Sequence, residues 1–394
     1  MALIKLNTRS IPDNAVTPAK VSQNLGRRNM TINGAMQVSQ RATSVTGITS
    51  GNNLTADRFS FYTGTNGGTY TLSTTTDVPS GEGFEKSLKI DCTTVGNYST
   101  AGTNTMLRCS PFEIQDCARL SYGTSGAKKL TVSFWTRASY AGTFSVLLVT
   151  HDTAQRSIIK TFTIASVNTW QKVILTYDGD TGSTFTGSDV ALGLSLDIWM
   201  GGGSNFTGGT QTDGVWRARS TQNTSILEGN GTLFGTSTSH DFYITGVQVE
   251  TGDTATDFEH RSFSEELASC KRYFQKSGNY DQYMTNGSST TTFGTGAKAW
   301  APCVEWGGSV AGHATHILSV EMRSTPSMTK YGNSQGYWGY IASGGSAPTS
   351  DNTLAFHQHL YIGADGTGVL GVNNQATGST IWGAMGGWTA DAEL

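Results

Sequence analysis

Five aromatic residues lie in glycine-rich stretches where a flat ring would be available to a ligand. The C–H faces of sugar rings are apolar and stack on such rings, so exposed Trp and Tyr are the groups expected to bind carbohydrate. The candidates for a binding site are Trp216, Tyr337, Trp338, Trp382 and Trp388. Packing in a hydrophobic core is the alternative for each of them. Trp135 and Trp170 lie inside predicted strands and are expected in the core.

Two pairs of residues have spacings that suit metal ions. His357 and His359 alternate along one predicted strand, so three such pairs on the axis of a trimer could bind an octahedral metal; hydrogen-bonded histidines on a strand face are the simpler interpretation. Asp178 and Asp180 could supply oxygen ligands to calcium, but an Asp-Gly hairpin turn explains them better. We therefore predict no cofactor and no metal site.

No arrangement of residues in the sequence predicts catalysis. There is no nucleophile elbow, no H-E-x-x-H motif and no phosphate-binding loop. Glu113 and Asp116 form an acidic pair, but closeness in sequence does not create the carboxylate geometry of a glycosidase. We expect a protein that is not an enzyme.

Composition favours an all-β protein. Charged residues make up 14% of the 394, against about 25% in ordinary soluble domains, and 49 glycines accompany abundant Ser, Thr and Asn. Such a chain suits short strands joined by tight turns.

The net charge of −3 gives no reason to expect nucleic acid as a partner, and no apolar run is long enough for membrane insertion. The five cysteines are irregularly spaced and are expected as free, buried thiols.

Alternating apolar residues predict a jelly-roll-like β-sandwich over residues 29–262. The predicted strands are separated by turn signals, as in a sandwich rather than in βαβ units. They cover residues 129–138, 144–150, 158–164, 170–177, 190–200 and 241–250. In the last of these strands the apolar phase changes at Gly246, which predicts a bulge or kink.

One amphipathic helix is predicted over residues 263–276, within a connecting segment at 263–277. Ser262 and Glu265 have the spacing of a capping box. Phe263, Leu267 and Cys270 then recur on one helical face together with Phe274.

Residues 278–394 are expected to form a second β-sandwich domain, with strands near 298–306, 316–323, 337–341, 354–362 and 369–372. Residues 1–28 are polar and are expected to form an extended arm.

Four stretches resemble a module of bacteriophage tail-fibre and related virion structural proteins. They are residues 28–41 (RNMTINGAMQVSQR), residues 247–277 with the motifs VQVE, AT, FE, EEL and CKRYFQKS, residues 320–328 and residues 388–394. In that module a β-sandwich closes on a strand, and a short helix leads to a C-terminal β-domain. The motifs are specific for this architecture, but they occur on tail fibres, adaptors and capsid decorations.

The resemblance implies a virion protein assembled in the bacterial cytoplasm. The arm would attach to other virion proteins, the chain would form a homotrimer, and the β-domains would bind a host surface glycan. A capsid decoration or connector protein of the same architecture is the alternative. A secreted carbohydrate-active protein is a third hypothesis, which the missing signal peptide and catalytic motif disfavour.

Overall fold

The computed structural model describes the chain from Arg27 onward, with gaps. The described residues are 27–49, 51, 55–151, 154–210, 213–230, 233–277, 280, 284–285, 299–305, 312–331, 339–342, 360–362, 368–373 and 381–394. Most of the predicted N-terminal arm lies outside them. No helix in these described ranges is long and apolar enough to cross a membrane.

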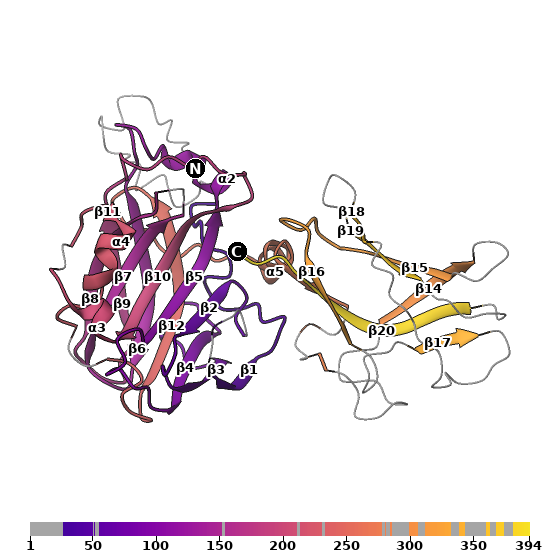
Figure 1. The fold of residues 1–394 in the computed structure, drawn as a ribbon, viewed down its shortest axis with the longest axis horizontal. Helices are drawn as coiled ribbons and strands as arrows, with labels where there is room; N and C mark the ends of the chain where they lie inside the picture. The colour runs from indigo at the N-terminus through magenta and orange to yellow at the C-terminus, as the bar shows by residue number, and fades with distance from the viewer. Residues whose placement is uncertain are drawn as a thin grey trace, which may run out of the picture.

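Two six-stranded antiparallel sheets form the first part of the described chain, which confirms the all-β sandwich. The first sheet has the order β1 (Ser44–Ile48), β3 (Thr69–Thr75), β4 (Ser87–Thr94), β12 (Asp241–Thr251), β6 (Leu130–Ala138), β9 (Gln171–Tyr177). The second has the order β11 (Arg217–Ala218), β8 (Arg156–Ile164), β7 (Gly142–Thr150), β10 (Leu192–Gly202), β5 (Asn104–Glu113), β2 (Phe59–Thr63) (Figure 1). All six strands predicted in this region are present; β1 to β5 and β11 were not predicted individually.

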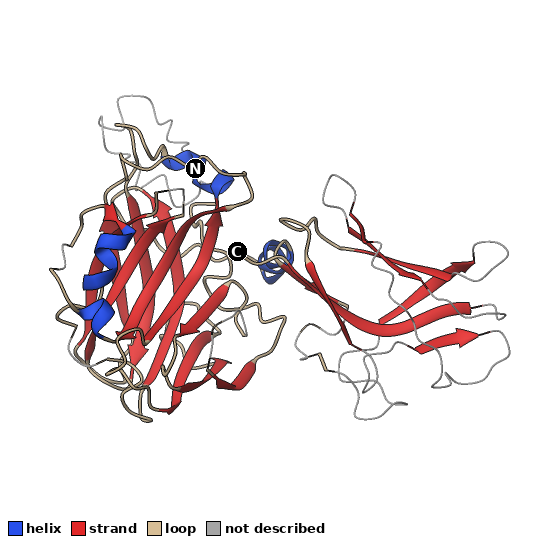
Figure 2. Ribbon diagram, viewed as in Figure 1, coloured by secondary structure: helices blue, strands red, loops and turns tan. Residues whose placement is uncertain are grey.

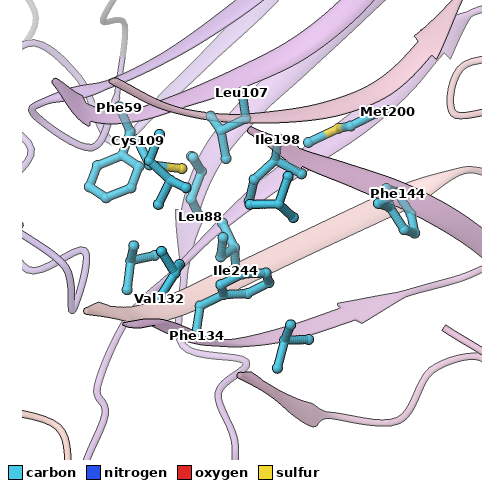
Figure 3. Packing of buried hydrophobic residues seen from close by; sticks show 14 of the residues in the cluster. Phe59, Leu88, Leu107, Cys109, Val132, Phe134, Phe144, Ile198, Met200 and Ile244 are labelled. Carbon is cyan, nitrogen blue, oxygen red and sulfur yellow. The ribbon is translucent and has the colours of Figure 1, made fainter. Parts of the chain in front are cut away.

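The core lies between the two sheets because each strand turns alternate side chains inward. Val132 and Phe134 of β6, Ile244 of β12 and Ile198 of β10 are fully buried in it (Figure 3). Cys92, Cys109, Cys117 and Cys270 are buried free thiols, as predicted. Their apolar surroundings raise the thiol pKa values, so these sulfurs are packing groups.

The outer face of the second sheet is covered by the segment between β10 and β12. That segment contains α3 (Ser204–Thr207), α4 (Arg219–Gln222) and the 3-10 turn η3 (Asn223–Ser225), and Figure 2 shows its helices along the side of the sandwich. Leu147 and Trp199 of the sheet pack with Ile226 and Leu227 of the segment. The helices α3 and α4 cover the second sheet, so the outer face of the first sheet is called the open face of the sandwich.

The predicted bulge in β12 is confirmed. Pairing between β12 and β6 shifts register between Thr245 and Gln248, and Gly246 has a φ of +63°. A Cβ at Gly246 would lie 2.5 Å from the ring of Phe84. Only glycine therefore satisfies both the backbone conformation and the close approach of this ring.

Replacing Gly246 with alanine should destabilise the sandwich by about 2–4 kcal/mol, since left-handed strain and overpacking act together. Gly47→Ala is the matched control, because Gly47 has a φ of +73° but nothing within 4 Å of its Cβ position. It should cost about 1 kcal/mol. Urea unfolding measures both, and equal losses would show that the Phe84 contact is unimportant.

The connecting helix α5 (Phe263–Lys271) begins where predicted but is shorter. The Ser262 hydroxyl accepts a hydrogen bond from the Glu265 N–H, and the Glu265 carboxylate accepts one from the Ser262 N–H at 3.0 Å, which confirms the capping box. The predicted end is wrong, since Phe274 belongs to the strand β13 (Phe274–Lys276), and the predicted apolar face is confirmed only in part: Cys270 is buried, but Phe263 is 46% exposed. Glu266 and Cys270 are the buried residues of the helix, because segment 27–41 and not an apolar surface lies against it.

The described strands of the C-terminal part form one antiparallel sheet of eight strands around β20 (Ile381–Asp391). Its other strands are β13, β14 (Ala299–Glu305), β15 (Gly312–Ile317), β16 (Ser327–Tyr331), β17 (Gly339–Ala342), β18 (Leu360–Ile362) and β19 (Gly368–Asn373). The prediction of a strand at 316–323 is shifted, since β15 ends at Ile317. Neither β16 nor β20 was predicted. β20 is the strand with which β13, β14, β16 and β17 all pair.

Segment 27–41 is hydrogen-bonded to residues that follow it by about 230 positions. The Asn29 amide donates to the Val247 carbonyl at 3.2 Å and accepts from the Val249 N–H at 3.1 Å. Glu259 accepts from the N–H groups of Arg27 and Asn29, both at 2.6 Å. Two of the stretches that carry the virion-protein resemblance, residues 28–41 and 247–277, are thus joined to each other by hydrogen bonds.

The last residues of the chain return to the sandwich. Asp391 and Glu393 pair with Arg41, at 3.0 and 3.5 Å, and Glu393 also pairs with the fully buried Arg58. Arg323 donates to the Ala392 carbonyl at 2.8 Å and to the Val190 carbonyl at 2.7 Å. Figure 1 accordingly shows the C-terminus close to α5, between the sandwich and the C-terminal sheet.

Candidate functional site

Two of the five predicted binding aromatics can be located with their side chains, and both are used in packing. The Trp216 indole N–H donates to the Asp178 carbonyl at 2.7 Å, and its ring packs edge-on against Tyr122. Trp388 is only 3% exposed, so core packing, the alternative for this candidate, is what the structure shows. The cause is the position of its strand: the end of β20 pairs with both β13 and β16 and leads into the junction with the sandwich.

The other predicted positions lie beyond what the structure describes. Tyr337, Trp338, His357 and His359 are outside the described residues, and for Trp382 only the backbone, in β20, is described. Their predicted roles are untested.

The possible calcium ligands at the end of β9 are engaged in ion pairs. Asp178 pairs with Lys129 at 3.1 Å. Asp180 is buried, pairs with Arg156 at 2.9 Å and accepts the Gly182 N–H within its own turn. The predicted Asp-Gly hairpin is wrong, since β9 and the next strand, β10, lie in different sheets. Among the described residues no group of three or more His, Cys, Asp or Glu is placed to hold a metal.

A small cavity opens on the outer face of the first sheet, at the bulge of β12. Its volume is about 230 Å³, and Trp135 forms part of its wall. Trp135 is half-buried, so its assignment to the core is wrong: Val132 and Phe134 of the same strand face inward, and Ser133 and Trp135 face the cavity. Strand alternation could have shown this, since adjacent residues cannot both face the core.

Neighbouring elements complete the cavity. Lys172 of β9 is directly opposite Trp135 of β6 in the sheet, and both line it. Phe258 and His260 line the side formed by the chain after β12. Their rings pack on Phe84, at centroid distances of 5.0 and 5.1 Å, and Phe84 occupies the space that a side chain at position 246 would fill.

The polar groups of this cavity suit hydroxyl-rich ligands. The Glu82 and Asp257 carboxylates can accept hydrogen bonds, and the Lys172 ammonium and Ser133 hydroxyl can donate them. Within the described part of the chain, neither Lys172 nor Glu82 has an ion-pair partner. A flat aromatic wall with both kinds of polar group fits one pyranose ring.

The same face continues from the cavity along β6 as an ordered polar and aromatic surface. Asp77 accepts from the Trp170 indole N–H at 3.1 Å and pairs with Arg137. The Arg137 guanidinium lies over the ring of Tyr243, 4.6 Å from its centroid. Trp170 is half-buried on this outer face, so its assignment to the core is also wrong.

Comparison with known proteins finds only weak structural similarity. No family model matches the sequence, and no curated protein matches it. Among solved structures, the enzymatically active domain of tailspike protein 4 from bacteriophage CBA120 is similar over 57% of this chain and 22% of its own length, with 11% identity and a TM-score of 0.30.

Two further similar structures have names that refer to sugars. A putative sugar binding protein from Bacteroides thetaiotaomicron aligns over 57% of this chain and all of its own, with 13% identity and a TM-score of 0.28. The family 11 carbohydrate-binding module from Clostridium thermocellum, in complex with a mixed-linked tetrasaccharide, aligns over 56% of this chain and 99% of its own, with 9% identity and a TM-score of 0.24. The chain is an all-β sandwich protein by its own two sheets, and its structural similarity to a phage tailspike domain and to carbohydrate-binding modules is weak.

Proposed function

We propose that this protein is a non-enzymatic bacteriophage virion protein, a tail fibre or tail-associated fibre, that binds a glycan on the host surface through the Trp135 cavity. The observation that carries the binding role is the cavity itself. It joins one half-buried Trp to Glu82 and Lys172, which have no ion-pair partner among the described residues, on the open face of the sandwich. Since no catalytic arrangement was found in the sequence, the proposed activity is recognition.

The virion role is supported by the motif resemblance together with what those motifs do. Glu259 joins residues 28–41 to the chain after β12, and the ion pairs of Arg41 with Asp391 and Glu393 join them to residues 388–394, so these motifs connect the sandwich to the C-terminal sheet. A fixed junction of this kind suits a component that carries load between a particle and a cell surface. The proposal includes a homotrimer attached to the particle through the N-terminal arm.

Trp135→Ala should weaken glycan binding at least about tenfold, roughly 1.4 kcal/mol, because the stacking wall is lost. The full-length protein is first screened on a panel of host surface saccharides and intact host cells, and the best ligand is then titrated by calorimetry. Trp216→Ala is the matched control, since it removes the same side chain away from the cavity. Circular dichroism confirms that both variants are folded.

Unchanged affinity of the Trp135 variant, or equal losses in both variants, would contradict this site. Immunogold labelling of purified particles tests the virion role and separates a tail fibre from the alternative, a capsid decoration or connector. Light scattering of the purified chain tests the trimer. A folded protein that binds no host saccharide but labels the particle would move the assignment to the connector.

A further inference from the structure

The Trp135 cavity is the middle of a longer strip of side chains on the open face. β6 and β9 are neighbours in the first sheet, and their alternate residues face outward, since Phe134, Thr136 and Val173 between them are buried. The outward residues of the two strands, with Trp170 directly before β9, are Ser133, Trp135, Arg137, Trp170, Lys172 and Ile174. We call these six side chains the β6–β9 strip.

The register of the two strands places the cavity between the ends of this strip. Lys172 lies opposite Trp135, and both line the cavity. Ile174 and Trp170 lie two positions away from Lys172 along the chain, one on each side. A strand rises about 3.3 Å per residue, so these two outer residues are separated by about 13 Å. A ligand that contacts both of them must be longer than one sugar ring.

Both ends of the strip offer surface to the apolar C–H faces of sugars. Ile174 is 53% exposed, so most of its side chain is open to a ligand. Trp170 is half-buried, and the Asp77 carboxylate, which pairs with Arg137, accepts its indole N–H at 3.1 Å. The Trp170 ring is thus held in place before a ligand arrives, which lowers the entropic cost of binding.

The polar groups along the strip carry both signs of charge. Arg137 is paired with Asp77, and Lys172 lines the same cavity as the carboxylates of Glu82 and Asp257. No excess of one sign therefore selects a strongly charged ligand. These groups supply hydrogen-bond donors and acceptors for hydroxyls, so a chain of hydroxyl-rich rings is the ligand that fits the whole strip.

We propose that the β6–β9 strip binds an interior stretch of a polysaccharide, with one sugar ring in the cavity and its two neighbours in the chain on Ile174 and Trp170. The inference rests on the proposed function, because the central ring is the one assigned to the Trp135 cavity. It adds the class of ligand, which is a repeating polymer whose chain runs along β9 and not the terminal sugar of a short glycan.

Calorimetry of the full-length protein with fragments of one, two, three and six sugar units tests the length of the ligand. The fragments are made by partial acid hydrolysis of the host surface polysaccharide and are separated by size. The three-unit fragment should bind at least about tenfold more tightly than the single sugar, and the six-unit fragment should gain little more. Equal affinity for all lengths would overturn the proposal.

Two variants locate the outer contacts. Ile174→Ala should weaken binding of the three-unit fragment about threefold and Trp170→Ala at least about tenfold, and both should leave binding of the single sugar unchanged. Trp170→Phe keeps an aromatic face and should retain most of the affinity. Val215→Ala and Trp216→Ala are the matched controls, because Val215 is 45% exposed and both residues precede β11 of the second sheet. Circular dichroism shows whether each variant is folded.

The outcomes distinguish this inference from the proposed function. If Trp135→Ala weakens every fragment but the Ile174 and Trp170 variants behave like their controls, the cavity site stands and the strip is refuted. If the two outer variants weaken the longer fragments and Trp135→Ala has no effect, the strip stands and the cavity site is wrong. A folded protein that binds no fragment would refute both.

Discussion

Replacing Arg58 with alanine should lower the free energy of unfolding by about 3–5 kcal/mol, since it leaves buried partners of a charge unpaired. The Arg58 side chain is fully buried, pairs with Glu393 and donates to the Pro111 carbonyl. Its guanidinium carbon lies 3.4 Å from the centroid of the Tyr273 ring. Arg58 also has a φ of +71°, unusual for a residue with a side chain, so these contacts hold it in a strained backbone.

Urea unfolding of the two variants Arg58→Ala and Arg217→Ala measures this. Arg217 is partly exposed in β11 and has no ion pair within the described chain, so its variant should change stability by less than about 0.5 kcal/mol. Arg58→Lys should fall between them, because it keeps the charge but loses the planar fork. A loss in Arg58→Ala no larger than in the control would refute the proposed role of the junction.

Glu113→Ala should cost a similar amount, about 3–5 kcal/mol, and should also change the response to acid. The buried Glu113 carboxylate, at the end of β5, accepts two bonds from Arg272, both at 2.8 Å, one from the Tyr273 hydroxyl at 2.7 Å and one from the Gln115 amide. Burial acts to raise the pKa of Glu113, but the bonds from Arg272 and Tyr273 outweigh it and hold the pKa below its usual value of 4.5.

The sign of the pH effect follows from that direction. The folded protein binds the proton of Glu113 less readily than the unfolded chain, so this stabilisation is present above pH 4.5 and is lost as pH falls through the folded pKa. Unfolding measured from pH 7 down to pH 3 should therefore show a shallower acid dependence in Glu113→Ala than in the natural protein. Glu113→Gln keeps the shape and should share the shallow slope. Identical slopes in all three would contradict the assignment.

Local features of the sequence determined the elements that depend on nearby residues. Alternation predicted β6, β10 and β12, because successive side chains of a strand point to opposite faces, and apolar runs between turn signals predicted β7, β8 and β9. The Ser262 and Glu265 spacing predicted the start of α5, and the phase change at Gly246 predicted the bulge, because both are set within a few residues of chain. The all-β class followed from the same patterns and from composition.

Tertiary structure decided which aromatic rings are available and what the shared motifs do. Trp135 is on the open face because the inward positions of β6 are taken by Val132 and Phe134, and Trp388 is buried because β20 ends in the junction. Asn29 meets Val247, and Arg58 meets Glu393, across more than two hundred residues. Such contacts have no signature in local spacing, since the energy of a buried polar group depends on the partner that folding brings to it.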